Sequence, residues 1–365
     1  MACVHVGGTN GKGSTCAFVA GELAARGFSV GVYTSPHLVS VRERIVVDGT
    51  PISEEAFAEW TGLLEPHIKR WNASFFEATT AIAFADLAAR GAEVAVIEVG
   101  LGGRLDSTNV ITPLASVVTK IALEHTDYLG SDLASIAREK AGIAKPGVPF
   151  VTGERDAAVR EVLITAAERR GANPVILVDT EIPAPRPLTL RGRHQHANAW
   201  VAHAALNALP PPFGPVGEAW PASFADAYLP GRFDVRGRWI FDVAHNPDGT
   251  RVLVDTLREH APPRPIHALV GVLGDKDYRG MIDILAPHVD AFVFTLPASA
   301  PANRRWDLER LARDWRGATG TALFTPDFDQ ALEQVQEGAE TVIVTGSFHT
   351  VGDVLARLPG FAPVG

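Results

Sequence analysis

The chain has 365 residues, of which 46% are hydrophobic and 21% charged, and its formal net charge is −9. This length favours two domains over one core, and the composition is that of a globular protein. The acidic balance, without a lysine and arginine block, argues against a nucleic-acid partner. No apolar run reaches membrane-spanning length, no export signal opens the chain, and two cysteines suit a reducing compartment, so we expect a soluble cytoplasmic protein without membrane contact.

The first predicted element is an apolar strand at residues 4–6, which runs into the sequence GGTNGKGST at residues 7–15. Such glycines let backbone N–H groups turn toward an anion, while the next helix offers its positive N-terminus and Lys12 a point charge. The spacing departs from the common phosphate-loop pattern, because Val6 replaces its first glycine and Gly13 separates Lys12 from Ser14. The alternative is a plain strand-to-helix turn, and we favour a nucleotide phosphate site.

The first half of the chain then alternates between predicted strands and helices, which is typical of a parallel sheet. The predicted strands span residues 29–34, 94–99, 115–119, 148–152 and 174–178. The predicted helices span residues 15–26, 75–90 and 156–170, with two more beginning at Ser53 and Ser131. The polar segment 35–44 is too long for a tight turn, so we interpret it as a functional loop.

Residues 182–228 are rich in proline around one predicted helix at residues 197–209, and we expect the join between two domains here. A second alternating series follows. Its predicted strands span residues 239–243, 266–271, 289–294 and 341–345, and its predicted helices span residues 248–259, 278–286, 307–315 and 328–337. We therefore predict an α/β protein with a P-loop ATPase-like parallel-sheet domain at residues 1–229 and a smaller Rossmann-like domain at residues 230–365.

Two carboxylates stand at the carboxyl ends of predicted strands, where open α/β sheets bind ligands. Glu98 ends a strand that is apolar on both faces, and a buried carboxylate needs a cation as its partner. Magnesium, which prefers oxygen ligands and bridges nucleotide phosphates, is one such cation, and an ion pair with Arg104 is the alternative. Asp242 is placed similarly, either to face a ligand or to cap the following helix.

Two basic side chains also stand out. Lys140 falls on the apolar stripe of its helix, so it must be paired or modified unless its stem snorkels and its head reaches water. His125 lies in the polar loop after the strand at 115–119, where it can bind metal or phosphate, or can be a surface or helix-capping histidine.

Taken together, these residues give a chain that closely resembles the folylpolyglutamate synthase/dihydrofolate synthase family, a branch of the Mur ligase superfamily. The matching motifs are GGTNGKGST at 7–15, TSPHL at 34–38, FFEATTAIAF at 75–84, EVGLGGRLDSTN at 98–109, HTDYLG at 125–130, REKAGIAKPG at 138–147, PGRF at 230–233, DVAHNPDG at 242–249 and TGSFHTVGDVL at 345–355. The resemblance implies an ATP-dependent ligase in which ATP phosphorylates a substrate carboxylate and the amine of L-glutamate attacks the acyl phosphate. The implied acceptor is dihydropteroate, a reduced folate such as tetrahydrofolate, or both.

The resemblance also implies residue roles, each at a position that matches a family motif. The implied ATP contacts are Thr9, Asn10, Gly11, Lys12, Gly13, Ser14, Asn198, Arg232 and Asp242. The implied metal ligands are Ser35 and Glu98 for one Mg²⁺, His125 for a second, and Lys140 as a carbamate formed with CO₂. The implied acceptor-binding residues are Ser74, Phe75, Phe76, Glu77, Leu105, Asp106 and Ser107, and the implied catalytic residues are Lys12, Lys140 and His245.

Two other functions remain as alternatives at this point. A cell-wall Mur-type amino-acid ligase would need a further N-terminal domain for its UDP-linked precursor. A non-catalytic nucleotide-binding regulatory protein would have no need of Glu98, His125 and Lys140. We expect a monomeric enzyme whose partners are small molecules: ATP, L-glutamate and the pterin-bearing acceptor.

Overall fold

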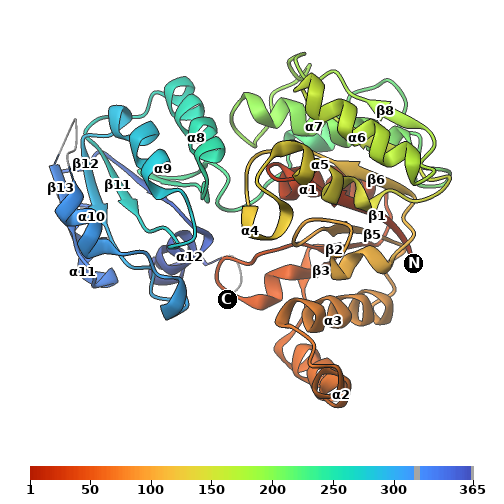
Figure 1. The fold of residues 1–365 in the computed structure, drawn as a ribbon, viewed down its shortest axis with the longest axis horizontal. Coiled ribbons are helices and arrows are strands. Elements are labelled where there is room, and N and C mark those ends of the chain that lie inside the picture. The colour runs from red at the N-terminus through yellow and green to blue at the C-terminus, as the bar shows by residue number, and fades with distance from the viewer. Residues whose placement is uncertain (316–320, 363–365) are drawn as a thin grey trace. The chain divides into compact units, whose positions relative to one another are not determined.

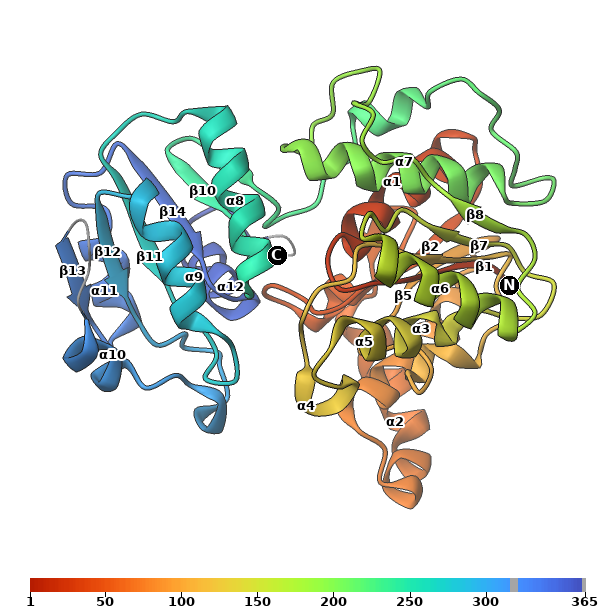
Figure 2. The same ribbon diagram turned by 45° about the horizontal axis from the view of Figure 1, so that its top comes forward.

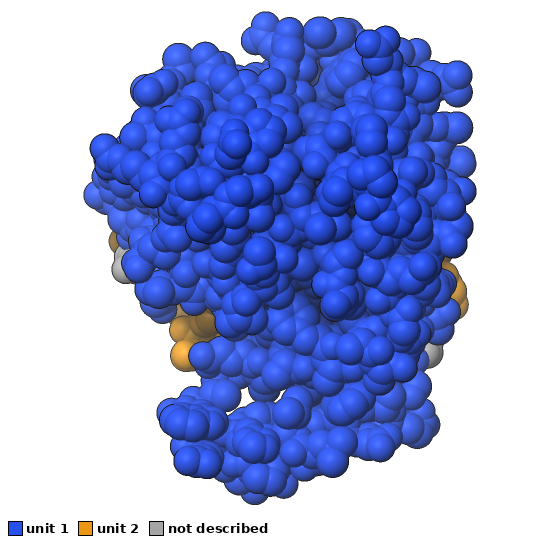
Figure 3. Space-filling model, turned by 90° about the vertical axis from the view of Figure 1, so that its right-hand side faces the viewer, with its two compact units in different colours: residues 1–189, 193–228 blue, residues 190–192, 229–365 orange. Residues whose placement is uncertain are grey.

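The computed structural model describes residues 1–315 and 321–362, which divide into two units. Unit 1 comprises residues 1–189 and 193–228, and unit 2 comprises residues 190–192 and 229–365 (Figures 1 and 3). The chain therefore passes from one unit to the other after residues 189, 192 and 228.

Unit 1 is built on an eight-stranded sheet with the order β4-β3-β2-β5-β1-β6-β7-β8. Its strands are β1 (Ala2–Gly7), β2 (Val30–Tyr33), β3 (Ile45–Val47), β4 (Thr50–Pro51), β5 (Val94–Glu98), β6 (Ala115–Val118), β7 (Phe150–Thr152) and β8 (Val175–Leu177). Strand β1 pairs in parallel with β5 and β6, and this register sets Glu98 opposite Val6. The central strands are apolar on both faces because helices cover both sides of the sheet.

The helices of unit 1 are α1 (Lys12–Ala25), α2 (Glu54–Trp71), α3 (Phe75–Ala89), α4 (Thr126–Leu129), α5 (Leu133–Lys140), α6 (Ala157–Arg169) and α7 (Arg193–Asn207). Helices α1 and α7 lie side by side on one face of the sheet, and α3, α5 and α6 cover the other (Figures 1 and 2). Helix α5 ends at Lys140, where a 3₁₀ helix at Ala141–Ile143 begins, and this places the lysine against the sheet.

Unit 2 contains a six-stranded sheet with the order β13-β12-β11-β14-β10-β9. Its strands are β9 (Asp234–Arg236), β10 (Trp239–Phe241), β11 (Ile266–Val270), β12 (Ala291–Phe294), β13 (Thr321–Phe324) and β14 (Thr341–Thr345). Its helices are α8 (Pro247–His260), α9 (Tyr278–Leu285), α10 (Leu308–Asp314), α11 (Phe328–Gln334) and α12 (Phe348–Arg357). Apolar residues of α8, α9 and α10 form one core with the sheet, and α12 packs on β14.

The predicted α/β class is confirmed, but the parallel sheets are bordered by antiparallel strands that the sequence did not indicate. Strand β3 pairs antiparallel with β2 and β4, and β9 pairs antiparallel with β10. Strands β9 and β13 and helix α12 were likewise not predicted. Within the described part of the chain, no helix combines the length and apolar character that a bilayer crossing requires.

Candidate active site

The loop from β1 to α1 depends on two glycines with left-handed backbone angles. Gly8 has φ +137° and Gly11 has φ +91°. A Cβ atom on Gly8 would lie 1.9 Å from Thr119 Oγ1, and one on Gly11 would lie 2.3 Å from Asn198 Oδ1 of α7. Because neither side chain is at the end of a long flexible stem, both positions require glycine.

Hydrogen bonds hold this loop in its turned shape. The Thr9 amide donates to Lys120 O at 2.8 Å, and Thr119 Oγ1 donates to Asn10 O at 2.8 Å. Helix α1 begins at Lys12, and its N-cap residue Gly11 has no side chain that could cap the helix. The N–H groups of its first turn, which include those of Gly13 and the buried Ser14, are therefore oriented to receive an anion.

Lys12, Glu98 and Ser35 meet beside this loop. Lys12 Nζ donates to Thr9 O at 3.1 Å and lies 3.9 Å from Glu98 Oε1. The Ser35 amide donates to Glu98 Oε2 at 3.3 Å, and Glu98 is only 4% exposed. Arg104, the alternative partner for Glu98, forms an ion pair with Glu139 at 3.0 Å.

Lys140 is buried under the same loop. It is 4% exposed, and its Nζ donates to Gly8 O at 2.8 Å. The snorkelling alternative is therefore wrong, because the ammonium group is not in water. Burial, and secondarily the positive charge of Lys12, lower the pKa of Lys140 to about 7, so about half of the amines are neutral at neutral pH.

His125 takes a left-handed conformation with φ 51° immediately before α4. Its Nε2 lies 3.5 Å from Glu124 Oε1, and its side chain does not cap α4, so the helix-capping alternative is wrong. Among the described side chains, no group of three or more His, Cys, Asp or Glu residues is placed to hold a metal.

The first predicted acceptor segment begins α3. Ser74 and Glu77 form a capping box, in which the Ser74 amide donates to Glu77 Oε2 at 2.8 Å, so these two side chains serve the helix terminus. Phe75 is 59% exposed, and the Arg44 guanidinium lies 5.3 Å from its ring centroid. Phe76 stacks with Tyr33, with 6.1 Å between ring centroids.

The second predicted acceptor segment lies in the loop after β5. Leu105 is 79% exposed, whereas its neighbour Asp106 is buried. Ser107 Oγ lies 3.0 Å from Thr80 Oγ1 of α3, so this loop contacts the helix that the first acceptor segment begins. Phe75 and Leu105 are therefore the members of this set that present apolar surface to solvent.

The remaining predicted residues lie in unit 2. Asp242 accepts hydrogen bonds from the Phe233 and Ala244 amides, each at 2.9 Å, while Asn246 caps α8, so Asp242 is not the helix cap. Burial raises the pKa of Asp242, and Arg232 opposes that shift. His245 Nδ1 lies 2.9 Å from Val243 O, so Nδ1 carries a proton and a neutral ring presents Nε2 as an acceptor.

Two residues near the site were missed in the sequence. Thr119 directly follows β6 and its hydroxyl holds the phosphate loop, while Arg44 is a buried guanidinium that donates to His37 Nδ1 at 2.9 Å. Arg44 lies in the loop interpreted as functional, and the signal that could have found it is a charged residue directly before an apolar strand.

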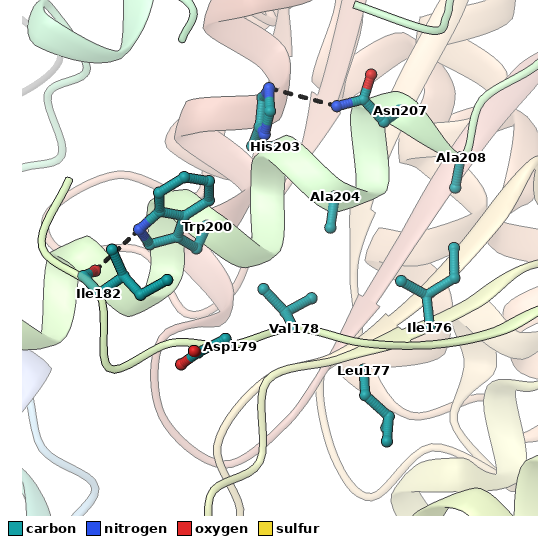
Figure 4. Close-up of a pocket in the computed structure, with 10 residues that line it drawn as sticks. All are labelled: Ile176, Leu177, Val178, Asp179, Ile182, Trp200, His203, Ala204, Asn207 and Ala208. Carbon is teal, nitrogen blue, oxygen red and sulfur yellow. Dashed lines mark hydrogen bonds between the residues drawn. The ribbon is translucent and has the colours of Figure 1, made fainter. Parts of the chain in front are cut away.

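A hollow of about 410 Å³ lies elsewhere in unit 1, between one face of α7 and β8 with the segment that follows it. Figure 4 shows Val178 pointing toward Ala204 of α7, and Trp200 Nε1 donating to Ile182 O at 2.9 Å. None of the predicted site residues lines this hollow.

Comparisons with known proteins match both units. The Mur ligase middle domain matches residues 6–185, and the glutamate ligase domain of Mur ligases matches residues 231–348. The dihydrofolate synthase/folylpolyglutamate synthase of Bacillus subtilis is 32% identical, over 97% of this chain and 90% of its own. An Escherichia coli FolC structure in complex with DHPP and ADP superposes with a TM-score of 0.85 at 32% identity, over 98% of this chain and 88% of that one. A bifunctional folylpolyglutamate synthase/dihydrofolate synthase with Mn, AMPPNP and L-glutamate bound gives a TM-score of 0.83 at 34% identity, over 98% and 89%.

Proposed function

This chain belongs to the dihydrofolate synthase/folylpolyglutamate synthase family of the Mur ligase superfamily, and we propose that it joins L-glutamate to dihydropteroate, to reduced folates, or to both, at the expense of ATP. The observation that carries this proposal is the geometry around the phosphate loop. An uncapped helix terminus, the Lys12 ammonium and the buried Glu98 converge there, and Lys140 lies beneath.

In the proposed reaction, the acceptor carboxylate oxygen attacks the γ-phosphorus of ATP, and ADP leaves. The glutamate nitrogen then attacks the acyl carbon, the C–N bond forms, and inorganic phosphate leaves with the former acyl oxygen. Both partners of the first step are anions, so positioning and charge neutralisation provide most of the catalysis.

Residues of unit 1 receive the nucleotide and the acceptor. Thr9 to Ser14 hold the phosphates through backbone N–H groups, and Lys12 lies against the transferred phosphoryl group. Asn198, whose Oδ1 a Cβ atom on Gly11 would approach to 2.3 Å, is a further contact of ATP. The segments at 74–77 and 105–107 hold the acceptor, with Phe75 and Leu105 as its apolar contacts.

Residues of unit 2 complete the proposed assignment. Arg232 and Asp242 contact ATP. His245 presents Nε2 as the acceptor for the proton that the glutamate amine loses, because its Nδ1–H is directed to Val243 O.

Magnesium fits the donors of unit 1. We assign Ser35 and Glu98 to one ion and His125 to a second, with the Lys140 carbamate contributing oxygen. Bound there, Mg²⁺ would neutralise the phosphate charge. The Lys140 amine supports the carbamate, because a buried amine with a pKa of about 7 is available in its neutral, reactive form.

We also propose that the protein is a monomer in the cytoplasm. The reducing compartment is supported by the two free cysteines, Cys3 and Cys16, which are buried and whose pKa values are raised by burial, as expected for unreactive thiols.

Phosphate release by the purified protein tests the proposed activity. With Mg-ATP and L-glutamate, dihydropteroate or tetrahydrofolate should start the release, and omitting either glutamate or the acceptor should stop it. The ratio of the two rates identifies the preferred acceptor. If neither pterin supported release, the proposed function would be wrong.

A further inference from the structure

A buried chain of hydrogen bonds connects strand β1 to the loop of residues 101–108, called here the acceptor loop. His5 in β1 is fully buried, and its Nε2 lies 2.8 Å from Thr108 Oγ1. The Thr108 hydroxyl and amide both contact Asp106 Oδ1, the amide at 2.9 Å. The other oxygen, Asp106 Oδ2, accepts from the Leu101 amide at 2.8 Å. The imidazole, the hydroxyl and the carboxylate therefore form one continuous path.

The chemistry of the three groups determines the direction of this path. An ionised carboxylate only accepts, so the Thr108 hydroxyl must donate to Asp106. The same hydroxyl oxygen then accepts from His5, which fixes the histidine tautomer with its proton on Nε2. Burial, with a smaller contribution from Lys145, lowers the pKa of His5 to about 3, so the ring stays neutral across the working pH range.

This arrangement is costly if it serves stability alone. His5 Nδ1 is buried and has no hydrogen-bond partner among the described residues. An unsatisfied buried polar atom costs about 1–3 kcal/mol, and apolar residues at both positions would avoid that cost. The path is therefore better explained by what it holds in place.

The hydrogen-bond path from His5 holds the acceptor loop in place. This loop carries an exposed apolar side chain next to buried residues. Leu105 is 79% exposed, while Asp106 beside it and Thr108 are buried. On one side Ser107 Oγ lies 3.0 Å from Thr80 Oγ1, and just beyond the loop Lys145 Nζ donates to Asn109 O at 2.7 Å. The loop is thus tied at its base while its tip faces solvent.

We propose that His5 and Thr108 are positioning residues for the pterin-bearing acceptor: through Asp106 they hold Leu105 and Ser107 in the shape that binds it. This inference rests on the proposed function. Neither residue touches the acceptor, and neither is expected to act on ATP. Because β1 also leads into the phosphate loop, the same strand sets the positions of both substrates.

Substitutions at Thr108 test this directly. Thr108→Val removes the hydroxyl and keeps the shape, so the KM for the acceptor should rise about tenfold, the order expected for one hydrogen bond to a charged group, with kcat and the KM for ATP within about twofold. Thr108→Ser keeps the hydroxyl and should restore the KM. Thr256→Val is the matched control, since it also removes a buried threonine hydroxyl, which donates to Val252 O within α8, and it should leave all three constants unchanged.

Substitutions at His5 test the length of the path. His5→Leu removes the donor to Thr108, so the KM for the acceptor should rise. His5→Gln can place an amide N–H near the position of Nε2, so the KM should return toward the wild-type value. The double variant with Thr108→Val should be no worse than Thr108→Val alone, because both changes break one path.

The outcomes separate this inference from the proposed function. If the wild-type protein released no phosphate with either pterin, the proposed function would fail first. If it were active and Thr108→Val lowered only the melting temperature, leaving the acceptor KM unchanged, the two residues would be structural and the inference would be overturned. Equal effects on the KM of ATP and of the acceptor would overturn it as well.

Discussion

The loop from β1 into α1 and the loop from β10 into α8 occupy the same kind of position, each at the carboxyl end of a parallel strand, yet their helices begin differently. The N-cap residue of α1 is Gly11, which has φ +91° and no side chain to cap the helix. Helix α8 is closed by Asn246, whose Oδ1 accepts from the Gly249 amide at 2.7 Å. The N–H groups at the start of α1 are thus available to an anion, whereas an N–H group at the start of α8 is already hydrogen-bonded to the Asn246 side chain.

This difference shows that two strand-to-helix loops at similar positions can have different functions. The first loop offers backbone N–H groups, so its residues are small and its glycines are held between Thr119 and Asn198. The second loop uses backbone N–H groups internally, on Asp242 and Asn246, so it would reach a ligand through a side chain such as that of His245. Substituting Gly11 in the first loop should therefore affect substrate turnover, whereas substituting the capping residue Asn246 in the second loop should mainly affect stability.

The largest expected effect is at Gly11. Gly11→Ala should abolish ATP-dependent phosphate release, because its Cβ would lie 2.3 Å from Asn198 Oδ1 and displace the loop. Nucleotide binding, measured by calorimetry with ADP, should be lost with it. Gly27→Ala is a matched control, since Gly27 has φ +90° but its added Cβ would meet no atom within 4 Å. It should cost about 1 kcal/mol of unfolding free energy and leave ADP binding intact. Equal loss of binding in both variants would attribute the effect to backbone strain alone.

A large but partial effect is expected at Lys140, which donates to Gly8 O beneath the first loop. Lys140→Ala should lower kcat at least about 100-fold, and formate or acetate should restore part of the rate by replacing the carbamate oxygens. An alanine variant with normal turnover would show that the lysine does not take part in metal binding.

The pH dependence of Lys140 gives a second measurement on the same residue. Only the neutral amine reacts with CO₂, and the pKa of about 7 makes about half of it neutral at pH 7, against roughly one part in a few thousand for an ordinary lysine. The carbamate, seen by carbon NMR with labelled bicarbonate, should therefore increase as the pH rises through 7 and decrease severalfold as the pH falls toward 6. A carbamate signal that did not change over this range would contradict the assignment.

The smallest effect is expected at Asn246 in the second loop. Asn246→Ala removes the side-chain cap of α8, so the unfolding free energy should fall by about 1 kcal/mol, as measured by urea denaturation. ADP affinity should stay within about twofold of the wild-type value. Asn246→Asp, which keeps a capping oxygen, should retain most of the stability. A loss of ADP binding in Asn246→Ala would contradict the contrast between the two loops.

The alternation of strands and helices was predictable because long apolar runs have strong periodicity. The central strands β1 and β5 and the helices α3 and α6 lie within a residue or two of their predicted bounds. The placement of Glu98 at the carboxyl end of β5 was also predictable, since a parallel strand that is buried on both faces leaves only its end for a carboxylate.

The missed elements are short or lie at sheet edges, where periodicity carries little information. Strand β3 has three residues, and its pairing with β2 is supported by Asp48, whose Oδ1 accepts from the Val30 amide at 2.7 Å. Contacts between distant residues were equally invisible, because nothing near His5 in the sequence indicates Thr108, and nothing near Gly8 indicates Lys140. The fold determines which residue is the partner in a buried hydrogen bond. The sequence shows only that a buried polar residue needs a partner.

Leu190–Gly192 belong to unit 2, although segments of unit 1 flank them on both sides. Arg191 Nη1 lies 2.9 Å from His260 Nδ1 at the end of α8, so this short segment has its own partner in the later part of the chain. A protease that cuts after Tyr228 would therefore leave three residues of unit 2 covalently attached to unit 1. During synthesis, the same segment leaves the ribosome before α7. Arg191 therefore cannot contact His260 until α8 has been synthesised. Unit 2 is thus complete only when the chain is kept in one piece from residue 190 onward.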